Sequence, residues 1–307
     1  MVDAAAASLL PPHARLAGAP ISWGVCEVPG WGPMLPAQRV LAEMAEIGLR
    51  GTELGAPGFL PDDADAVAAL LRAHQLTLVG GFVPLVLHEP DASAGLAAAR
   101  EAISLFARAG GEVLVLALVQ DMDWSAPAEL DDAAWRALDK NVREVVALAA
   151  ERSITVALHP HVGTLVESAD QVARALEQLE VGWCLDTGHL LIGGYDPVEF
   201  ARRNAQRVVH VHLKDVDADV AGRVRDGSLS LLDATRAGLF RPLGEGDVDV
   251  KAVLDELRSV GYGGWLVLEQ DTALTGDEPT VGGGPMLDVK RSIAFVHGLA
   301  QTKEERV

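Results

Sequence analysis

The stretch Val181-Gly-Trp-Cys-Leu-Asp-Thr-Gly-His189 shows the pattern that decides the fold. It begins with a short, almost continuous apolar run, which is typical of a strand buried on both faces of a parallel sheet. The run stops at Asp186, and a carboxylate is expensive to bury unless it has a partner or a function. We therefore expect parallel strands that end in functional residues. Similar apolar runs recur at Ala19–Trp23, Gly51–Gly55, Leu76–Val83, Val113–Leu118, Ile154–His159, Val208–His212 and Trp265–Glu269.

Stretches rich in Ala, Leu, Glu and Arg lie between these runs and predict helices, for example at Leu41–Ile47, Ala94–Ala109, Asp131–Glu151 and Val253–Val260. A strand followed by a helix, repeated eight times, predicts a closed (β/α)₈ TIM barrel, for which about 250 residues is typical. We expect one domain over residues 1–307, with a tail at 1–17, a long loop at 216–250 after the seventh strand and a tail after the last helix. An open, doubly wound sheet is the alternative, although no strand precedes Gly282–Gly284 with dinucleotide-binding spacing.

Composition and charge exclude several classes of function. No apolar stretch is long or pure enough to span a membrane, and the Ala-rich start lacks the basic residues of a signal peptide. Cys26 and Cys184 do not make a disulfide scaffold, and Cys184 is expected to be a small buried hydrophobe. We therefore expect a cytoplasmic protein. Its net charge of −19 argues against a nucleic-acid partner and fits a small neutral polyol or keto-sugar substrate.

Four consecutive strands of the predicted barrel end in residues that bind metals. His159, Asp186, His212 and Glu269 close the fifth to the eighth strand. Functional residues of such a barrel come from the carboxyl ends of its strands, so these four are expected to converge. Two imidazoles and two carboxylates favour Mn²⁺ or Co²⁺, with Mg²⁺, Fe²⁺ or Zn²⁺ as alternatives, over Ca²⁺. One such histidine alone would be interpreted as a hydrogen-bonded core residue, whereas the four together predict a metal site.

Four further histidines lie away from the predicted ligands and indicate little about the function. His13, His74 and His297 fall in a tail or on helices and are expected on the surface. His88 follows the third strand, and its position is left open between the mouth of the site and a structural place.

Three motifs resemble the xylose-isomerase-like superfamily of divalent-metal barrels. They are Asp186-Thr-Gly-His189, His210-Val-His-Leu-Lys-Asp215 and a last strand that ends in Glu269. Members of that superfamily isomerise, epimerise or dehydrate sugars, or cleave DNA at abasic sites. Further segments look like the inosose dehydratases of myo-inositol catabolism, and the similarity then covers residues 18 to 300. These segments are His159–Thr164, Ala221–Asp233, Arg236–Phe240, Pro242–Asp247, Ala19–Trp23 and Gly51–Gly55.

One position departs from the superfamily pattern. In most relatives the fifth strand ends in a glutamate that binds the metal and acts as a base, whereas this chain has His159 there. Inosose dehydratases also have histidines at this place, so the departure supports the narrower resemblance. Glu167 follows eight residues later and is the alternative first ligand. We prefer His159, because a residue at a strand end needs no rearrangement of the loop.

The resemblance implies a metal-dependent dehydratase of a keto-inositol, and the chemistry assigns roles to several residues. A base removes the proton α to the carbonyl, and an acid protonates the β-hydroxyl that leaves, while the metal stabilises the enolate. His161, His189 and His210 are candidates for the acid or the base. Lys214 is a candidate for binding an oxyanion or hydroxyl, with an ion pair to Asp215 or Asp186 as the alternative. Glu269 is assigned to the catalytic set as well as to the ligands.

Three residues near the first two strands are expected to line the sugar pocket: Trp23, Trp31 and Glu53. Aromatic faces suit the C–H side of a polyol ring. For Trp23, simple packing at the barrel mouth is the alternative.

Other functions remain as alternatives. A metal-dependent isomerase or epimerase of a ketose or keto-sugar shares enolate formation with the dehydratase. An abasic endonuclease is disfavoured, because it needs an Asp-x-His pair just after the seventh strand, and Asp215-Val-Asp217 is followed by no histidine before His297. A metal-free binding protein is the last alternative. Barrels of this kind often pair, so a homo-oligomer is a further expectation.

Overall fold

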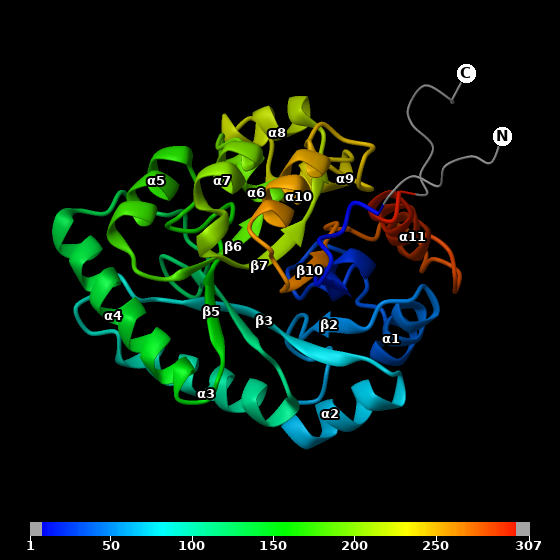
Figure 1. Ribbon diagram of the computed structural model, residues 1–307, viewed down its shortest axis with the longest axis horizontal. Coiled ribbons are helices and arrows are strands. Elements are labelled where there is room, and N and C mark those ends of the chain that lie inside the picture. Colours follow the sequence, from blue (N-terminus) through cyan, green and yellow to red (C-terminus); the bar gives the residue numbers. More distant parts are fainter. Residues whose placement is uncertain (1–7, 299–307) are drawn as a thin grey trace.

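The computed structural model describes residues 8–298 and contains a closed barrel of parallel strands in the order β1-β10-β7-β6-β5-β4-β3-β2 (Figure 1). The barrel closes because β1 pairs with both β10 and β2. The predicted TIM barrel is therefore confirmed, and the open sheet is wrong. The barrel strands are β1 (Arg15–Gly18), β2 (Gly51–Glu53), β3 (Thr77–Leu85), β4 (Val113–Leu118), β5 (Thr155–Leu158), β6 (Gly182–Asp186), β7 (Val208–Leu213) and β10 (Trp265–Leu268).

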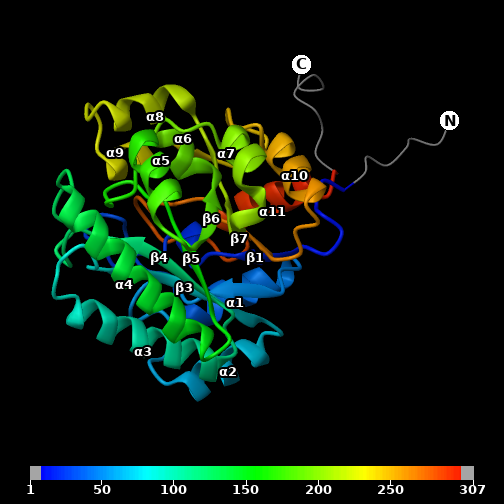
Figure 2. The same ribbon diagram turned by 60° about the vertical axis from the view of Figure 1, so that its left-hand side comes forward.

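Helices surround the strands in both ribbon views (Figures 1 and 2). The longest, α4, begins after Asp131, whose side chain accepts a hydrogen bond from the Ala134 N–H and so satisfies a free donor of the first turn. Its apolar side faces the barrel, with Leu138, Val142 and Val145 buried in the core. The outer helices are α1 (Ala37–Glu46), α2 (Ala64–Ala73), α3 (Ser93–Ala109), α4 (Asp132–Ala150), α5 (Ala169–Gln178), α6 (Thr187–Ile192), α7 (Pro197–Asn204), α10 (Val250–Ser259) and α11 (Pro285–Val296).

The first strand lies earlier than the sequence analysis placed it. The predicted strand Ala19–Trp23 is wrong: β1 ends at Gly18, and Pro20–Trp23 form the 3₁₀-helix η1. Pro20 has no N–H for a strand ladder, and its fixed φ suits the first position of a helix. Residues 15–17 therefore belong to the barrel rather than to a tail. Residues 1–7 of the predicted tail, and 299–307 after the last helix, lie outside the described residues.

The segment at 216–250 has secondary structure of its own. It contains α8 (Ala218–Arg225) and α9 (Leu231–Arg236), and the strand β9 (Phe240–Arg241) pairs antiparallel with β8 (Asp215–Val216). Helix α8 packs beside α6, and α9 packs beside α8 (Figures 1 and 2). Asp215 holds the end of this segment next to its beginning. Its carboxylate accepts hydrogen bonds of 2.8 to 3.0 Å from the N–H groups of Gly244, Gly246 and Val248.

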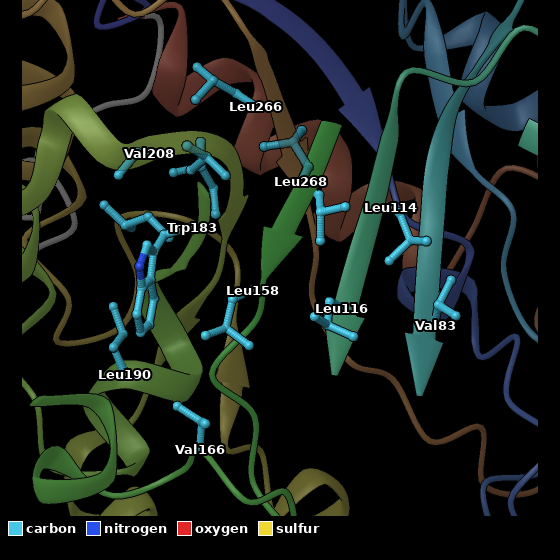
Figure 3. Packing of buried hydrophobic residues seen from close by; sticks show 14 of the residues in the cluster. Val83, Leu114, Leu116, Leu158, Val166, Trp183, Leu190, Val208, Leu266 and Leu268 are labelled. Carbon is cyan, nitrogen blue, oxygen red and sulfur yellow. The ribbon is translucent and has the colours of Figure 1, made fainter. Parts of the chain in front are cut away.

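The core has two layers, which explains where the polar strand ends point. Leu116, Leu158 and Trp183 belong to the large cluster between barrel and helices (Figure 3). Side chains alternate along a strand, so their neighbours point into the barrel. Small inner clusters contain residues such as Ala157, Cys184 and Val267. Two residues further along each of these strands, toward the carboxyl end, the inward position is polar. Within residues 8–298 no helix has the length and apolarity needed to cross a membrane.

Candidate active site

The four predicted ligands meet at the carboxyl end of the barrel. His159 Nε2 lies 3.1 Å from Asp186 Oδ2, and the same oxygen lies 3.5 Å from His212 Nδ1. His212 Nδ1 in turn lies 2.6 Å from Glu269 Oε2. His159, Asp186 and Glu269 follow the inward apolar residues of β5, β6 and β10, and His212 follows the inward His210 of β7, so the barrel itself holds them together. Distant parts of the chain thus form one cluster, as the strand-end pattern predicts.

The donor atoms of three of these residues fit one metal ion. Asp186, His212 and Glu269 each offer one ligand atom, and these atoms all lie within 4.8 Å of one another. His212 Nδ1 and Glu269 Oε2 are buried and in contact, yet neither makes a hydrogen bond. Metal bonds of about 2.0 to 2.2 Å place two ligands of one ion about 3 Å apart. Two buried ligand atoms that face each other at this distance are therefore what a cation site requires.

His159 lies beside this set rather than within it. Its Nε2 atom is in hydrogen-bonding contact with Asp186, and its Nδ1 atom is buried without a hydrogen-bond partner. A second group of possible ligand atoms consists of His159, Cys184 and His212. The alternative ligand Glu167 is engaged elsewhere, since its carboxylate accepts a 2.8 Å hydrogen bond from the Gly163 N–H. His159 thus lies closer to the predicted ligands than Glu167 does.

Glu53 lies inside the barrel and contacts two histidines. One of its oxygens is 2.9 Å from His210 Nε2 and 2.9 Å from His212 Nε2. Burial favours the neutral acid, but His212 and His210 outweigh it and hold the pKa of Glu53 well below its usual range. Because an ionised carboxylate only accepts, His212 donates through Nε2 and presents Nδ1 to Asp186 and Glu269. Glu53 is therefore a hydrogen-bond partner of the cluster histidines, and its predicted role in the sugar pocket stays a prediction.

His210, predicted as a candidate acid or base, lies deeper in the barrel than His212. It precedes His212 by two residues on β7, so it points into the barrel one layer deeper. The side chain is fully buried and bonded to Glu53. Burial lowers the pKa of His210, although Glu53 opposes this effect. These contacts suit a support for Glu53 better than an acid or base that meets a substrate.

Lys214 is buried among three carboxylates. Its Nζ atom lies 3.0 Å from Asp271 Oδ1, 3.4 Å from Glu269 Oε1 and 3.5 Å from Asp186 Oδ2. Burial lowers the pKa of Lys214, but the carboxylates outweigh it and the pKa is raised, so the ammonium is charged. The expected ion pair with Asp186 is present, whereas Asp215 serves the loop after β9 instead. The same Nζ atom lies 3.0 Å from His189 Nε2.

Asp271 is a member of the cluster to which the sequence analysis gave no role. Burial raises its pKa to about 6, against the charge of Lys214. Asp271 follows Glu269 by two residues, and residues with this spacing point to the same side of an extended chain. This spacing is the feature of the sequence that could have predicted Asp271 in the cluster.

His161 and His189 form a pair of rings next to the ligands. Their ring centroids lie 3.9 Å apart. Burial, together with the neighbouring His159, lowers the pKa of His161 to about 3, and burial likewise lowers the pKa of His189. Both imidazoles are therefore neutral near pH 7. His161 is half-buried and His189 fully buried, so His161 is the more accessible of the two.

The two tryptophans expected in the pocket are both buried. Trp23 is fully buried on η1, and its indole N–H donates a 2.8 Å hydrogen bond to Glu43 on α1. The earlier end of β1 turns this ring toward the helix layer, which supports the packing interpretation. Trp31 is buried as well, and its carbonyl accepts a hydrogen bond from the Leu274 N–H in the segment after β10. We therefore assign the Trp23 ring to packing, whereas the role of Trp31 in the sugar pocket stays a prediction.

The outlying histidines lie mostly as expected. His13 and His297 are exposed, and His74 is half-buried at the end of α2. His88, which was left open, is buried, with its Nε2 atom 3.3 Å from Gln120 Nε2. Cys184 is a buried free thiol in the inner layer, as expected for a small hydrophobe.

A closed barrel with a ligand-type cluster at its carboxyl end defines a metal-barrel class of enzyme folds. Residues 41–293 match the family described as xylose isomerase-like TIM barrel, and the chain belongs to that family. This confirms the resemblance seen in the motifs.

Two relatives narrow the comparison. The chain is 34% identical over 266 residues to the rhizopine catabolism protein MocC of Rhizobium meliloti, across 84% of this chain and 81% of that protein. It is 32% identical over 282 residues to an inosose dehydratase of Geobacillus kaustophilus, across 85% and 89%. A solved structure of the IOLI protein with a bound zinc atom superimposes with a TM-score of 0.70 at 15% identity, over 92% of this chain and 98% of that chain. At this low identity, the similarity to the IOLI structure supports the fold alone.

Proposed function

We propose that this protein is a metal-dependent dehydratase that acts on a keto-inositol (inosose) in inositol catabolism. The observation that carries the proposal is the facing pair of buried donors, His212 Nδ1 and Glu269 Oε2, beside Asp186. The inosose dehydratase relative, matched over 85% of this chain, supports the reaction class. The zinc atom bound in the IOLI structure supports a divalent ion as the cofactor of this chain. A small neutral polyol also fits the acidic character of the chain.

Asp186, His212 and Glu269 would hold the ion, with His159 as a fourth ligand. A mixed nitrogen and oxygen set suits Mn²⁺ or Co²⁺, and Zn²⁺, Fe²⁺ or Mg²⁺ are the other candidates. When bound, such an ion polarises the ketone oxygen and makes the neighbouring C–H bond more acidic. Glu53 accepts a hydrogen bond from His212 Nε2 and so keeps the His212 ring oriented for metal binding through Nδ1.

The neighbouring polar groups supply proton transfer. His161 is neutral and half-buried, so it is placed to exchange a proton with a substrate above the ligands. Lys214 is charged and donates to His189 Nε2, which makes this pair a source of positive charge for the hydroxyl that leaves. In the elimination, His161 accepts the proton from the α carbon, and the Lys214–His189 pair gives a proton to the β oxygen. The C=C bond forms as the β C–O bond breaks, and water is released. The Glu269 side chain contacts both His212 and Lys214.

The test is the product formed from scyllo-inosose by metal-loaded protein in deuterated water. The proposal expects loss of water and absorbance of the resulting dione or its enol. An isomerase or epimerase would instead return an isomer with deuterium at one carbon and no water lost, and that outcome would replace the proposal. Protein stripped of metal by a chelator is the control.

A further inference from the structure

Phe82 is an exposed aromatic residue on a barrel strand. Its neighbours Gly81 and Val83 on β3 are buried, whereas Phe82 is 37% exposed. Its ring centroid lies 5.8 Å from that of His159, in an edge-on arrangement, and 5.4 Å from that of His161. The ring therefore borders the histidine side of the candidate site, and solvent reaches it from the other side.

Trp124 extends this aromatic surface from the loop after β4. Its ring is 42% exposed and almost parallel to Phe82, with centroids 6.1 Å apart and an interplanar angle of 12°. It also lies 6.2 Å from the His161 ring centroid. Strand β3 and the loop after β4 thus bring two aromatic rings, 42 residues apart in the sequence, into contact with the His161 ring.

The backbone holds Trp124 in a conformation that a tryptophan rarely adopts. Its φ is 57°, in the left-handed region. Asp121 stabilises the turn, since its side chain accepts 3.0 Å hydrogen bonds from the N–H groups of Asp123 and Ser125. Strained non-glycine residues of this kind persist where the surrounding structure fixes them, and they concentrate at ligand sites.

We propose that Phe82 and Trp124 form an aromatic wall that binds the C–H face of a cyclic polyol and directs the oxygen-bearing edge of its ring toward Asp186, His212 and Glu269. The proposal rests on the proposed function of that site and adds the two residues that select a cyclic substrate over an open-chain one. Aromatic faces carry partial negative charge and attract C–H groups, and small-molecule sites combine such surfaces with a few polar groups. His159 links the two parts, because it contacts Phe82 by its ring and Asp186 by a hydrogen bond.

The wall accounts for selectivity that the polar cluster alone does not supply. Carboxylates and imidazoles bind any carbonyl with neighbouring hydroxyls. A flat apolar surface next to them favours a ring whose C–H bonds project from one face, as in an inositol, over an open-chain polyol whose C–H and O–H groups point in all directions.

The experiment compares Trp124→Ala, Trp124→Phe and Phe82→Leu with Met122→Ala. Met122 is on the same loop and is 61% exposed, so it is a matched control for loss of an exposed apolar side chain. Binding of myo-inositol is measured by calorimetry, kinetics are measured with scyllo-inosose, and metal content is determined on each preparation. We expect Trp124→Ala and Phe82→Leu to raise Kd and KM about fivefold to tenfold with metal content unchanged. Trp124→Phe should keep most of the affinity, and Met122→Ala all of it.

Each other outcome overturns a definite claim. Unchanged Kd and KM in both wall variants of an active enzyme would overturn the wall and leave the dehydratase standing. Loss of myo-inositol binding in the variants, with no water lost from scyllo-inosose by the wild type, would support the wall and reject the dehydratase. A wild type that binds no cyclic polyol would overturn both. If sedimentation shows that Trp124→Ala lowers the mass in solution while KM is unchanged, the surface is an interface between copies of the chain and the wall is wrong.

Discussion

A carboxylate oxygen of Glu53 on β2 lies 2.9 Å from the Nε2 atom of His212 on β7. The contact spans the inside of the barrel and leaves the other ring nitrogen, Nδ1, facing Asp186 and Glu269. A hydrogen bond of this kind fixes which nitrogen carries the proton and how the ring is turned. Since the same oxygen also contacts His210, the lower layer of the barrel supports the ligand above it.

Replacement of Glu53 tests this support. Glu53→Gln keeps the size of the side chain but allows its amide to donate as well as accept, so the His212 ring loses its fixed tautomer. We expect metal affinity to fall about 10- to 100-fold, as for other partners of metal-binding histidines. Chelator competition measures the affinity, and the visible spectrum of the Co²⁺-loaded protein reports the ligand geometry.

Glu43→Gln is the matched control for Glu53→Gln. Glu43 is also buried, but it bonds Trp23 and Arg39 on the outer side of the barrel. Its replacement should leave metal affinity unchanged. Equal metal affinity in Glu53→Gln and the wild type, with both proteins folded by circular dichroism, would contradict the supporting role.

Loss of a central ligand should abolish metal binding without unfolding the barrel. Asp186 has two functions, because its second oxygen also caps α6 by accepting the His189 N–H at 2.7 Å. We therefore choose Asp186→Asn, which retains a capping oxygen, rather than Ala, whose loss of the cap costs about 1 kcal/mol. Elemental analysis should find no stoichiometric metal, and the melting temperature should stay close to that of the metal-free wild type.

Asp196→Asn is the comparison for Asp186→Asn, because Asp196 caps α7 in the same way. It should keep both metal and activity. Stoichiometric metal in Asp186→Asn would remove Asp186 from the ligand set.

The strand ends were predictable because apolar runs and polar stops are local features of the sequence. Once the barrel closes, His159, Asp186, His212 and Glu269 must meet, and the motif spacing alone indicates this. The contact of Glu53 with His212 was not predictable, since it joins strands 159 residues apart through side-chain length and direction. The sequence placed Glu53 at the right end of the barrel but could not distinguish a pocket residue from a histidine partner.

The misplaced first strand shows a second limit. Ala19–Trp23 has the apolar composition of a strand, but Pro20 turns it into a 3₁₀-helix and shifts β1 to Arg15–Gly18. The shift moves Trp23 from the pocket to a bond with Glu43. Phe82 looked like an ordinary strand residue, and only the structure places its ring beside His161.

The Asp215 carboxylate should determine the stability of the segment after β7. Asp215→Ala leaves the N–H groups of Gly244, Gly246 and Val248 without their acceptor, so we expect a loss of about 2–4 kcal/mol in the free energy of unfolding. Limited proteolysis should show earlier cleavage between residues 216 and 250. Asp249→Ala removes a single cap, from α10, and should cost about 1 kcal/mol. Equal losses in the two variants would show that Asp215 has no special role.

The last prediction concerns His159, where the chain departs from its superfamily. As a fourth ligand, His159 can be replaced by a carboxylate, so His159→Ala should weaken metal binding and His159→Glu should restore part of it. If His159 served only as a hydrogen-bond partner of Asp186, at 3.1 Å, the better substitute would be Gln, because its amide can donate to the carboxylate. In that case His159→Glu would be worse, because a second carboxylate would repel Asp186. Metal content and kcat are measured on the same preparations, and we expect Glu to bind more metal than Gln. The reverse order would reject the ligand role. Full metal in His159→Ala with turnover lost would make His159 a catalytic group, since a residue used only in the transition state lowers kcat without weakening ground-state binding.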